Sequence, residues 1–271
     1  MKERVDVLAV NQGLFETREQ AKRGVMEGLV VAARSGERFD KPGQKIEADL
    51  ELRLKGEKLR YVSRGGLKLE KALDVFNITI GEKVCLDIGA STGGFTDVML
   101  QNGAKLVYAL DVGTNQLAWK IRQDARVVVM EQFNFRKAVP EDFPEVPHFA
   151  TIDVSFISLS LILPVLHAIL ADRGEVVALI KPQFEAGRED VGKNGIIKDE
   201  KVHRKVLETT LQMAIETGFS VLGLTFSPIK GGAGNVEFLV QLKKEEVARY
   251  AKSVAIDAVL SAEKESLGEK K

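Results

Sequence analysis

The sequence predicts an α/β protein in which a small α+β domain is followed by a mostly parallel sheet flanked by helices. From residue 67 onward, apolar strand-like runs alternate with helix-like segments. A glycine-rich turn at residues 89–94 follows the first of these strands. Before residue 59 the pattern is different, with two short helices and a few short strands, which indicates a separate unit.

The composition is that of an ordinary globular chain, with 271 residues, 45% hydrophobic and 29% charged. Lys+Arg and Asp+Glu both number 39, so a globally basic nucleic-acid binder is excluded and any basic surface must be local. The single cysteine, Cys85, permits no intrachain disulfide, and the three histidines show no metal-ligand spacing. We therefore expect a cytoplasmic protein without a metal.

The first domain is expected over residues 1–58. A helix over 4–13 ends at Gly13, and Thr17 with Gln20 forms a capping box that begins a second helix over 17–27. Strands are predicted over 29–33 and 46–54. Arg18 and Lys22 lie four residues apart on the second helix, which places both on one face.

Residues 59–66 are expected to be a linker, residues 67–262 the second domain, and the charged residues 263–271 a flexible tail. Strands are predicted over 83–88, 106–111, 126–130, 148–154, 175–181, 220–226 and 235–242, and helices near 67–76, 94–102, 114–123, 158–170, 200–217 and 244–260. The longest apolar stretch, 157–170, is too short and too polar to span a membrane, so we expect no membrane association.

The turn after the first strand of the second domain contains Gly89, Gly93 and Gly94, and Asp87 lies at the end of that strand. Asp111 ends the next strand, where a carboxylate can accept hydrogen bonds from ribose hydroxyls. The spacing is not Gly-x-Gly-x-x-Gly, so a diphosphate site is not indicated. An adenosine ligand without a diphosphate fits, and S-adenosylmethionine is such a ligand. The alternative is a tight turn in an ordinary βα unit.

Four ionisable residues are expected to meet beside this turn. Asp153 and Lys181 end two strands, Glu237 lies at the start of the last strand, and Lys68 lies on the helix before the sheet. Such a group suits methyl transfer to a ribose 2′-hydroxyl, which is a poor nucleophile until its proton is removed. Taken singly, each residue is more often a surface ion-pair partner.

Two other methylation chemistries are less well supported. Residues 153–156, Asp-Val-Ser-Phe, loosely resemble the Asp/Asn-Pro-Pro-Tyr/Phe signature of amino-group methyltransferases, but both prolines are missing. Methylation of a pyrimidine ring carbon usually needs a nucleophilic cysteine, and Cys85 lies within a predicted buried strand.

The motifs of the second domain, at residues 63–69, 87–97, 153, 181–184 and 237, resemble FtsJ-like 2′-O-ribose methyltransferases. Residues 17–22 and 41–43 look like the S-four-type RNA-binding domain. The combination is similar to the TlyA family, whose members are often labelled haemolysins and methylate cytidine ribose in ribosomal RNA. The resemblance implies a Rossmann-like methyltransferase domain that uses S-adenosylmethionine and acts on ribosomal RNA or ribosomal subunits.

The resemblance also implies roles for particular residues. Lys68, Asp153, Lys181 and Glu237 would form a catalytic tetrad in which Lys181 is the base. The cofactor-binding set would be Asp87, Gly89, Ser91, Thr92, Gly93, Gly94, Phe95, Asp111, Val112, Phe133 and Asn134, the last two near the adenine. The candidates for contacts with RNA phosphates are Arg4, Arg18, Lys22, Arg23, Arg60 and Arg64.

Two alternative functions remain open from the sequence. One is a haemolysin or pore-forming protein, and the other is a ribosome assembly factor that binds RNA without catalysis. Residues 182–201, which follow Lys181 and contain several glycines, are either a lid that orders on RNA or a long surface loop.

Overall fold

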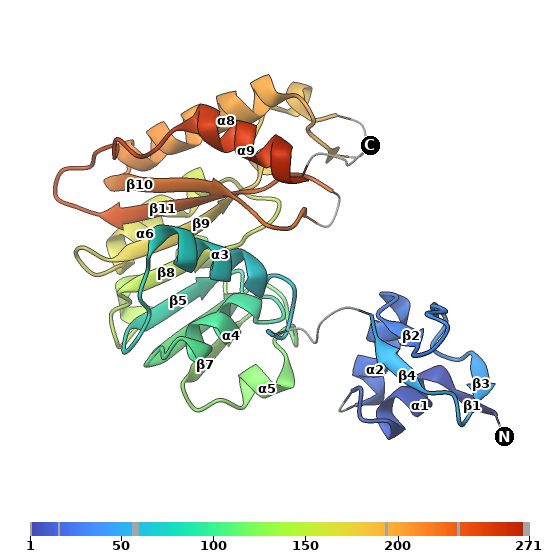
Figure 1. The fold of residues 1–271 in the computed structure, drawn as a ribbon. Helices are drawn as coiled ribbons and strands as arrows, with labels where there is room; N and C mark the ends of the chain where they lie inside the picture. Colours follow the sequence, from blue (N-terminus) through green and yellow to red (C-terminus); the bar gives the residue numbers. More distant parts are fainter. Residues whose placement is uncertain (1, 16, 56–59, 193–194, 232–233, 268–271) are drawn as a thin grey trace. The chain divides into compact units, whose positions relative to one another are not determined.

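The computed structural model describes residues 2–15, 17–55, 60–192, 195–231 and 234–267 (Figure 1). The chain forms two compact units, Met1–Arg60 and Tyr61–Lys271. The second unit begins within the segment expected to be a linker, because Tyr61 Oη donates a hydrogen bond to Glu70 (2.8 Å) and the amide of Val62 donates one to Asp97 (2.9 Å).

The first unit contains two helices and two pairs of short antiparallel strands. Its elements are β1 (Lys2–Arg4), α1 (Val5–Asn11), α2 (Arg18–Met26), β2 (Val30–Ala32), β3 (Lys45–Glu47) and β4 (Leu52–Leu54). Strand β1 pairs with β3, and β2 pairs with β4. The predicted capping box of Thr17 and Gln20 is confirmed. The single strand expected over 46–54 is wrong: a turn closed by Leu50 N and Glu47 O divides it into two.

A seven-stranded sheet forms the centre of the second unit, in the order β10-β11-β9-β8-β5-β6-β7. The strands are β5 (Val84–Ile88), β6 (Leu106–Asp111), β7 (Val127–Glu131), β8 (Phe149–Ile152), β9 (Glu175–Ile180), β10 (Phe219–Phe226) and β11 (Phe238–Lys244). Strand β11 is antiparallel to both of its neighbours, β10 and β9, and the other strand pairs of the sheet are parallel. The order reverses between β5 and β8, which is where Rossmann-like sheets bind ligands. The predicted Rossmann-like architecture is confirmed.

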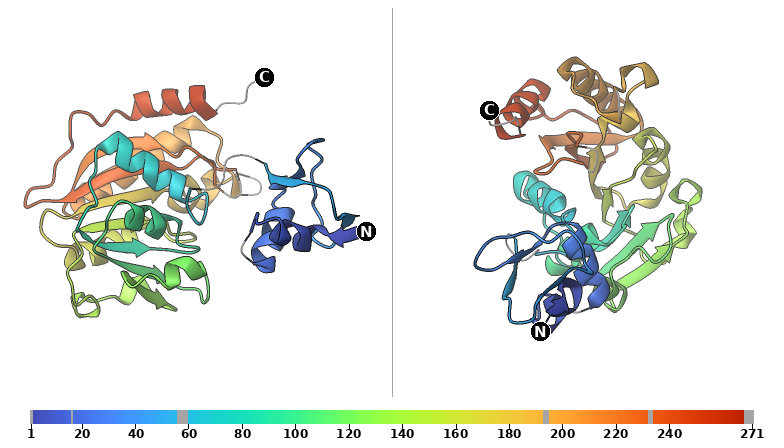
Figure 2. Two further views of the ribbon diagram at one scale, coloured as in Figure 1. Left: turned by 60° about the horizontal axis from the view of Figure 1, so that its bottom comes forward. Right: turned by 90° about the vertical axis from the view of Figure 1, so that its right-hand side faces the viewer.

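Helices cover both faces of this sheet (Figures 1 and 2). Helices α3 (Gly66–Phe76), α4 (Gly94–Gln101) and α5 (Trp119–Arg122) pack on one face, in a core that includes Cys85. Helices α6 (Leu163–Ile169), α8 (Glu200–Glu216) and α9 (Ile256–Leu267) pack on the other face, and the short helix α7 (Pro182–Glu185) follows β9. Cys85 is fully buried, as the strand pattern predicts.

Three predicted helices differ from those observed. The helix expected near 114–123 is limited to α5. The one expected near 158–170 is divided into a 3₁₀ turn, Leu159–Leu161, and α6, which has Pro164 in its first turn.

The helix expected over 244–260 is wrong, because α9 begins only at Ile256 and continues to Leu267. The preceding segment runs along the edge strand β10. There Val221 exchanges backbone hydrogen bonds of 2.9 Å with Arg249 and Ala251. An edge strand leaves amide and carbonyl groups unpaired, and this extended segment satisfies some of them. The expected tail is therefore helical as far as Leu267, and residues 268–271 lie outside the described residues.

Candidate active site

The four residues of the expected tetrad come from four elements that meet at one edge of the sheet. Asp153 follows β8 and Lys181 follows β9, so both lie at the carboxyl ends of neighbouring parallel strands. Glu237 directly precedes β11, whose antiparallel direction brings its beginning to the same edge. Lys68 lies in the first turn of α3.

The structure brings these four side chains into direct contact. Lys181 Nζ lies 2.6 Å from Asp153 Oδ1, and Lys68 Nζ lies 3.4 Å from Asp153 Oδ2 and 2.7 Å from Glu237 Oε2. The result is a continuous chain of alternating charges in which Asp153 joins the two lysines. Gly231 leaves room for Glu237, at the far end of this chain of charges, since a Cβ at residue 231 would lie 2.5 Å from Glu237 Oε1.

All four side chains of this chain of charges are largely buried. The side chains of Lys68, Lys181 and Glu237 are 10%, 9% and 4% exposed, and that of Asp153, between the two lysines, is 20% exposed. Burial alone would lower the pKa of Lys68, but the carboxylates of Asp153 and Glu237 outweigh it and the pKa is raised. Lys68 therefore stays charged and is not suited to be a base. Lys181 lies at the other end of the chain of charges, where it pairs with Asp153.

Ser155 is a further contact of the tetrad that the sequence did not indicate. Lys181 Nζ donates a hydrogen bond to Ser155 Oγ (3.0 Å). Ser155 lies only two residues after Asp153, so a single short loop orients Lys181 at two points. No sequence motif indicates this serine. Its contact with Lys181 arises because the loops that follow β8 and β9 lie next to each other.

The glycine turn is joined to the tetrad through Gly89. This residue has φ +87°, and a Cβ there would lie 2.5 Å from the backbone oxygen of Asp153. Gly93 also has a positive φ, +93°. Gly89 and Ala90 both donate backbone hydrogen bonds to the carbonyl of Leu110, which fixes the turn to β6. The turn thus bends sharply around the residue that carries the central carboxylate of the tetrad.

The remaining residues of the turn have different surroundings. Ser91 is exposed with φ +49°, and the carbonyl of Thr92 accepts a hydrogen bond from Ala118 (3.0 Å). Gly94 is buried at the start of α4, where a Cβ would lie 2.3 Å from Ser63 Oγ. Phe95 is 4% exposed and packs in the core beneath α3 and α4. We therefore assign Phe95 a packing role rather than the cofactor contact that was expected.

Asp87 is fully buried, and its carboxylate points into the protein. Oδ2 accepts a hydrogen bond from Thr96 Oγ1 (2.6 Å), and Oδ1 accepts one from Thr151 Oγ1 (2.9 Å). These bonds tie the end of β5 to α4 and β8. We therefore assign Asp87 to shaping the turn rather than to the cofactor contact expected from the sequence. Burial raises the pKa of Asp87 to about 6 despite both hydrogen bonds.

Replacement of Asp87 by asparagine should flatten the pH dependence of stability between about pH 4 and pH 6. The pKa of Asp87 is raised on folding from 3.8 to about 6. Its stabilising effect is therefore complete below the unfolded-state pKa and is lost as pH rises through the folded-state pKa, by up to about 3 kcal/mol. Urea denaturation of both proteins from pH 4 to pH 8 measures this. Equal slopes in the two proteins would contradict the assignment.

Asp111 ends β6 beside the turn and is half-buried. Its Oδ2 accepts a hydrogen bond from the amide of Ser91 (2.8 Å), and its Oδ1 accepts one from the amide of Gly113 (2.8 Å). Each carboxylate oxygen retains a second acceptor site, which suits ribose hydroxyls. The next residue, Val112, is 75% exposed and offers an apolar surface at the same position.

Glu131, at the end of β7, organises the neighbouring loop and was not identified from the sequence. It accepts hydrogen bonds from the amides of Asn115 (2.9 Å) and Gln116 (3.0 Å) and pairs with Arg122 (2.5 Å). This loop occupies the place of the first half of the helix expected near 114–123. An acidic residue at a strand end is a detectable signal, but its partners are not.

Phe133 and Asn134 follow β7, and their side chains have neighbours within the protein. Phe133 is half-buried and packs edge-on against Phe143, with ring centroids 6.4 Å apart. Asn134 is exposed, and its side chain accepts a hydrogen bond from the amide of Arg136 (3.1 Å). The amide of Phe133 donates to the carbonyl of Asp111 (3.0 Å), which keeps this segment next to the acidic strand end.

The segment expected to be a lid or a loop, residues 182–201, contains α7 and a 3₁₀ turn, and residues 193 and 194 lie outside the described residues. Asn235 attaches the C-terminal part of this segment to the site. Asn235 Nδ2 donates to the carbonyl of Gly195 (2.8 Å), and Oδ1 accepts from the amide of Ile197 (2.9 Å). The segment is therefore attached two residues before Glu237.

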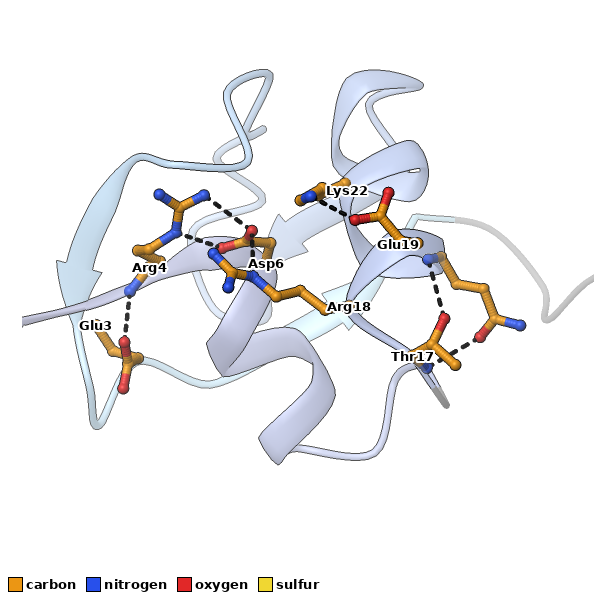
Figure 3. A network of polar contacts seen from close by, with 8 residues as sticks. Glu3, Arg4, Asp6, Thr17, Arg18, Glu19 and Lys22 are labelled. Atoms are coloured by element: carbon orange, nitrogen blue, oxygen red, sulfur yellow. Dashed lines mark hydrogen bonds and ion pairs between the residues drawn. The ribbon is translucent and has the colours of Figure 1, made fainter.

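In the first unit, two of the expected RNA-binding residues share one buried carboxylate (Figure 3). Asp6 has no exposed surface and pairs with Arg4 Nε (2.9 Å) and Arg18 Nε (3.0 Å). The hydrogen bond from Arg4 is the largest influence that lowers the pKa of Asp6, to about 2. One carboxylate with two guanidinium groups leaves a net positive charge at the surface.

The other RNA-binding candidates lie in exposed or partly exposed positions. Lys22 pairs with Glu19 one turn earlier on α2, and Arg23 is exposed beside it. Arg60 and Arg64 are also exposed, at the end of the first unit and at the beginning of the second.

The described residues contain neither a candidate metal centre nor a candidate membrane-spanning helix. No group of three or more His, Cys, Asp or Glu residues in this part of the chain is arranged to hold a metal ion. Within the same part, no helix has both the length and the apolar character needed to cross a bilayer.

Comparison with known proteins agrees with this geometry. Residues 61–244 match the FtsJ-like methyltransferase family. A Bacillus subtilis protein provisionally named as an rRNA methyltransferase, YqxC, is 61% identical over 89% of this chain and 85% of its own. The 16S/23S rRNA (cytidine-2′-O)-methyltransferase TlyA of Mycobacterium tuberculosis is 39% identical over 89% of this chain and 90% of its own.

A solved structure covers nearly the whole chain. A Streptococcus thermophilus protein provisionally named as a hemolysin is 65% identical, covers 98% of this chain and 97% of its own, and superposes with a TM-score of 0.79. The family match covers the unit that carries the tetrad and the glycine turn, and the curated relatives extend over both units. The chain therefore belongs to the FtsJ-like methyltransferases and, within them, to the TlyA family.

Proposed function

We propose that the protein methylates the 2′-hydroxyl of a cytidine ribose in ribosomal RNA, with S-adenosylmethionine as the methyl donor. The observation that carries the proposal is the contact between Lys181 and Asp153, 2.6 Å apart at the sheet edge where Gly89 meets Asp153. A relative with 39% identity is named as a methyltransferase of this specificity. Since ribosomal RNA is the substrate, we also propose that the protein acts in the cytoplasm.

The residues around the glycine turn fit S-adenosylmethionine. The positive φ angles of Gly89 and Gly93 allow close approach of the backbone, and Asp111 presents a half-buried carboxylate for ribose hydroxyls. Val112 offers an exposed apolar surface for the adenine. When bound, the cofactor supplies an electrophilic methyl group. We propose that these residues, with Ser91, Thr92, Phe133 and Asn134 around them, form its site.

In the proposed mechanism, Lys181 in its neutral amine form would accept the proton of the ribose hydroxyl as that oxygen bonds to the methyl carbon, and the bond from this carbon to the cofactor sulfur would break with its electron pair left on the sulfur. Asp153 and Ser155 hold the Nζ of Lys181 in place through contacts of 2.6 and 3.0 Å. Lys68 and Glu237 fix Asp153 from the buried side. A positioned base of this kind contributes about 10²–10⁴-fold to the rate.

Phe156 offers a surface for the target base. It lies three residues after Asp153, is 90% exposed, and its ring centroid is 5.0 Å from that of Phe184. RNA bases that are turned out of a helix commonly stack on such aromatic faces. We infer that the target nucleoside stacks on Phe156 when its ribose lies beside Lys181.

The test of this function is incubation of naked ribosomal RNA and of each ribosomal subunit with labelled S-adenosylmethionine. Ribose methylation is then mapped at nucleotide resolution. We expect label on the 2′-oxygen of cytidine. Label on a base nitrogen or carbon would overturn the proposal. Binding of RNA and cofactor without any transfer would favour the assembly-factor alternative instead.

Neutralising the basic residues of α2 should weaken RNA binding. We expect the combined change of Arg18, Lys22 and Arg23 to glutamine to lower affinity for ribosomal RNA about 10-fold or more. The slope of log affinity against log salt concentration should fall by up to about 2–3, because each of the three lost phosphate contacts removes about 0.7–0.9 from it. Asp6 keeps Arg4 as a partner, so the unit should still fold.

The matched control for this variant is the change of Arg34, Lys45 and Arg53 to glutamine, three exposed positions of the same unit. It removes the same charge from other parts of the surface. Filter binding over a range of salt concentrations compares the two. Equal losses in both variants would show that net charge, and not the α2 surface, determines the affinity.

A further inference from the structure

The loop after β8, residues 153–160, is fastened to the segment after β9, residues 181–185. Because β8 and β9 are parallel neighbours, the segments that follow them lie side by side. At one end, Lys181 contacts Asp153 and Ser155. In the middle, the rings of Phe184 and Phe156 meet at 5.0 Å.

Glu185 makes the contact at the other end. Its Oε2 accepts a hydrogen bond from Ser158 Oγ (2.7 Å), and its Oε1 accepts one from the amide of Leu159 (2.8 Å). Ser158 in turn caps the following 3₁₀ turn, since its Oγ accepts from the amide of Ser160 (3.1 Å). Hydrogen bonds to a carboxylate are stronger than those between neutral groups, so Glu185 fixes the conformation of this end of the loop.

Phe156, between these two attachments, has a conformation that needs support. Its φ is +63°, in the left-handed region that bulky residues rarely adopt. Such a backbone persists only when its surroundings impose it. Phe156 is 90% exposed, so its contact with the ring of Phe184 supplies only a small part of that support. The attachments on either side, through Lys181 and Glu185, therefore hold the backbone of Phe156.

We propose that Glu185 is a positioning residue for the RNA substrate. By binding Ser158 and Leu159, it keeps the backbone of Phe156 left-handed and so sets the aromatic face that the target nucleoside meets beside Lys181. Glu185 acts through this loop and does not itself touch the reacting atoms. The inference rests on the proposed function, because it assumes that RNA is the molecule that approaches Phe156.

The experiment compares Glu185→Ala and Glu185→Gln with the wild-type full chain, with ribosomal RNA and S-adenosylmethionine as substrates. In Glu185→Ala we expect KM for RNA to rise about 10-fold or more, while cofactor affinity stays within about twofold of wild type. Glutamine retains an acceptor for the amide of Leu159, so Glu185→Gln should restore much of the loss. Glu208→Ala, at an exposed position on α8, is the matched control and should behave as wild type.

A second measurement follows the loop itself. In a Trp119→Phe background, Phe156→Trp places the only tryptophan of the chain in the loop, since the sequence has one. Its fluorescence anisotropy should be lower with Glu185→Ala than without it, in the absence of RNA. Ser158→Ala, which removes one hydrogen bond without removing a charge, should give a smaller change in the same direction.

The outcomes separate this inference from the proposed function. If the wild-type protein methylates RNA but Glu185→Ala leaves KM for RNA and the anisotropy unchanged, the inference is wrong. An equal loss of cofactor affinity would also overturn it, because the residue would then act on the whole site. If the wild-type protein transfers no methyl group to RNA, the proposed function fails, whereas the anisotropy still tests the link between Glu185 and Phe156.

Discussion

Replacement of Lys181 by methionine should lower methyl transfer to ribosomal RNA by about 10²–10⁴-fold while the fold is retained. Methionine has nearly the length of lysine but cannot accept a proton. Removal of the Lys181 amine leaves Asp153 paired with Lys68 at 3.4 Å, so the change leaves no buried carboxylate without a cation. The loss should therefore appear in the rate of transfer and not in stability.

Initial rates of label incorporation measure this effect, together with calorimetric titration of the cofactor and filter binding of RNA. Both affinities should remain within a few-fold of wild type. Lys201→Met, at an exposed position on α8, is the control for loss of a lysine. An unchanged rate in Lys181→Met would remove Lys181 from the role of base. A loss confined to cofactor affinity would assign it to binding instead.

Removal of Lys68 is expected to have a different effect from removal of Lys181. The side chain of Lys68 is 10% exposed and lies 2.7 Å from Glu237, whose side chain is 4% exposed. Removing Lys68 would leave that carboxylate buried without a cation, which typically costs about 3–5 kcal/mol. We therefore expect removal of Lys68 to lower stability and removal of Lys181 to lower the rate of methyl transfer.

The sheet and the meeting of the tetrad were predictable because both follow from general rules of α/β folds. Asp153 and Lys181 end strands that lie on one side of β5, and the carboxyl ends of parallel strands share one edge. The location of each of these residues at the site therefore follows from its position at the end of its strand. No knowledge of side-chain contacts is needed to bring them together.

The partners of these residues were not predictable, because their contacts join distant parts of the chain. Thr151 hydrogen-bonds Asp87 from 64 residues away, and Glu185 holds Ser158 across 27 residues. Neither contact is indicated by a characteristic spacing or by a motif in the sequence. The expected cofactor role of Asp87 depended on its place at a strand end, whereas the direction of its side chain depends on those threonines.

The wrong helix over 244–260 has a different origin. Val247, Ala251, Val254 and Val259 have the spacing of a helical face, but the edge of β10 offers a competing set of backbone hydrogen bonds. The segment before Ile256 pairs with this edge, and Val247 is left 76% exposed. Periodicity alone does not detect such an edge, because strand order is a property of the whole sheet.

The second large effect is expected from Gly89→Ala, which should weaken both cofactor binding and methyl transfer by about 10-fold or more. The new Cβ would lie 2.5 Å from the backbone oxygen of Asp153, so either the glycine turn or Asp153 must move. The φ of +87° adds strain of about 1–3 kcal/mol for a residue with a side chain. A carbonyl in the backbone cannot rotate away as a flexible side chain would.

Gly103→Ala is the control variant that has the backbone strain of Gly89→Ala without its steric clash. Gly103 has φ +82°, but a Cβ there would meet its nearest neighbour, Gly81 Cα, at an ordinary 3.6 Å. Both variants should lose stability in chemical denaturation, and only Gly89→Ala should lose cofactor affinity and activity. If the two variants lost activity equally, backbone strain alone would explain the effect, and the contact between Gly89 and Asp153 would have no part in it. If Gly89→Ala bound the cofactor normally, the turn would not be the cofactor site.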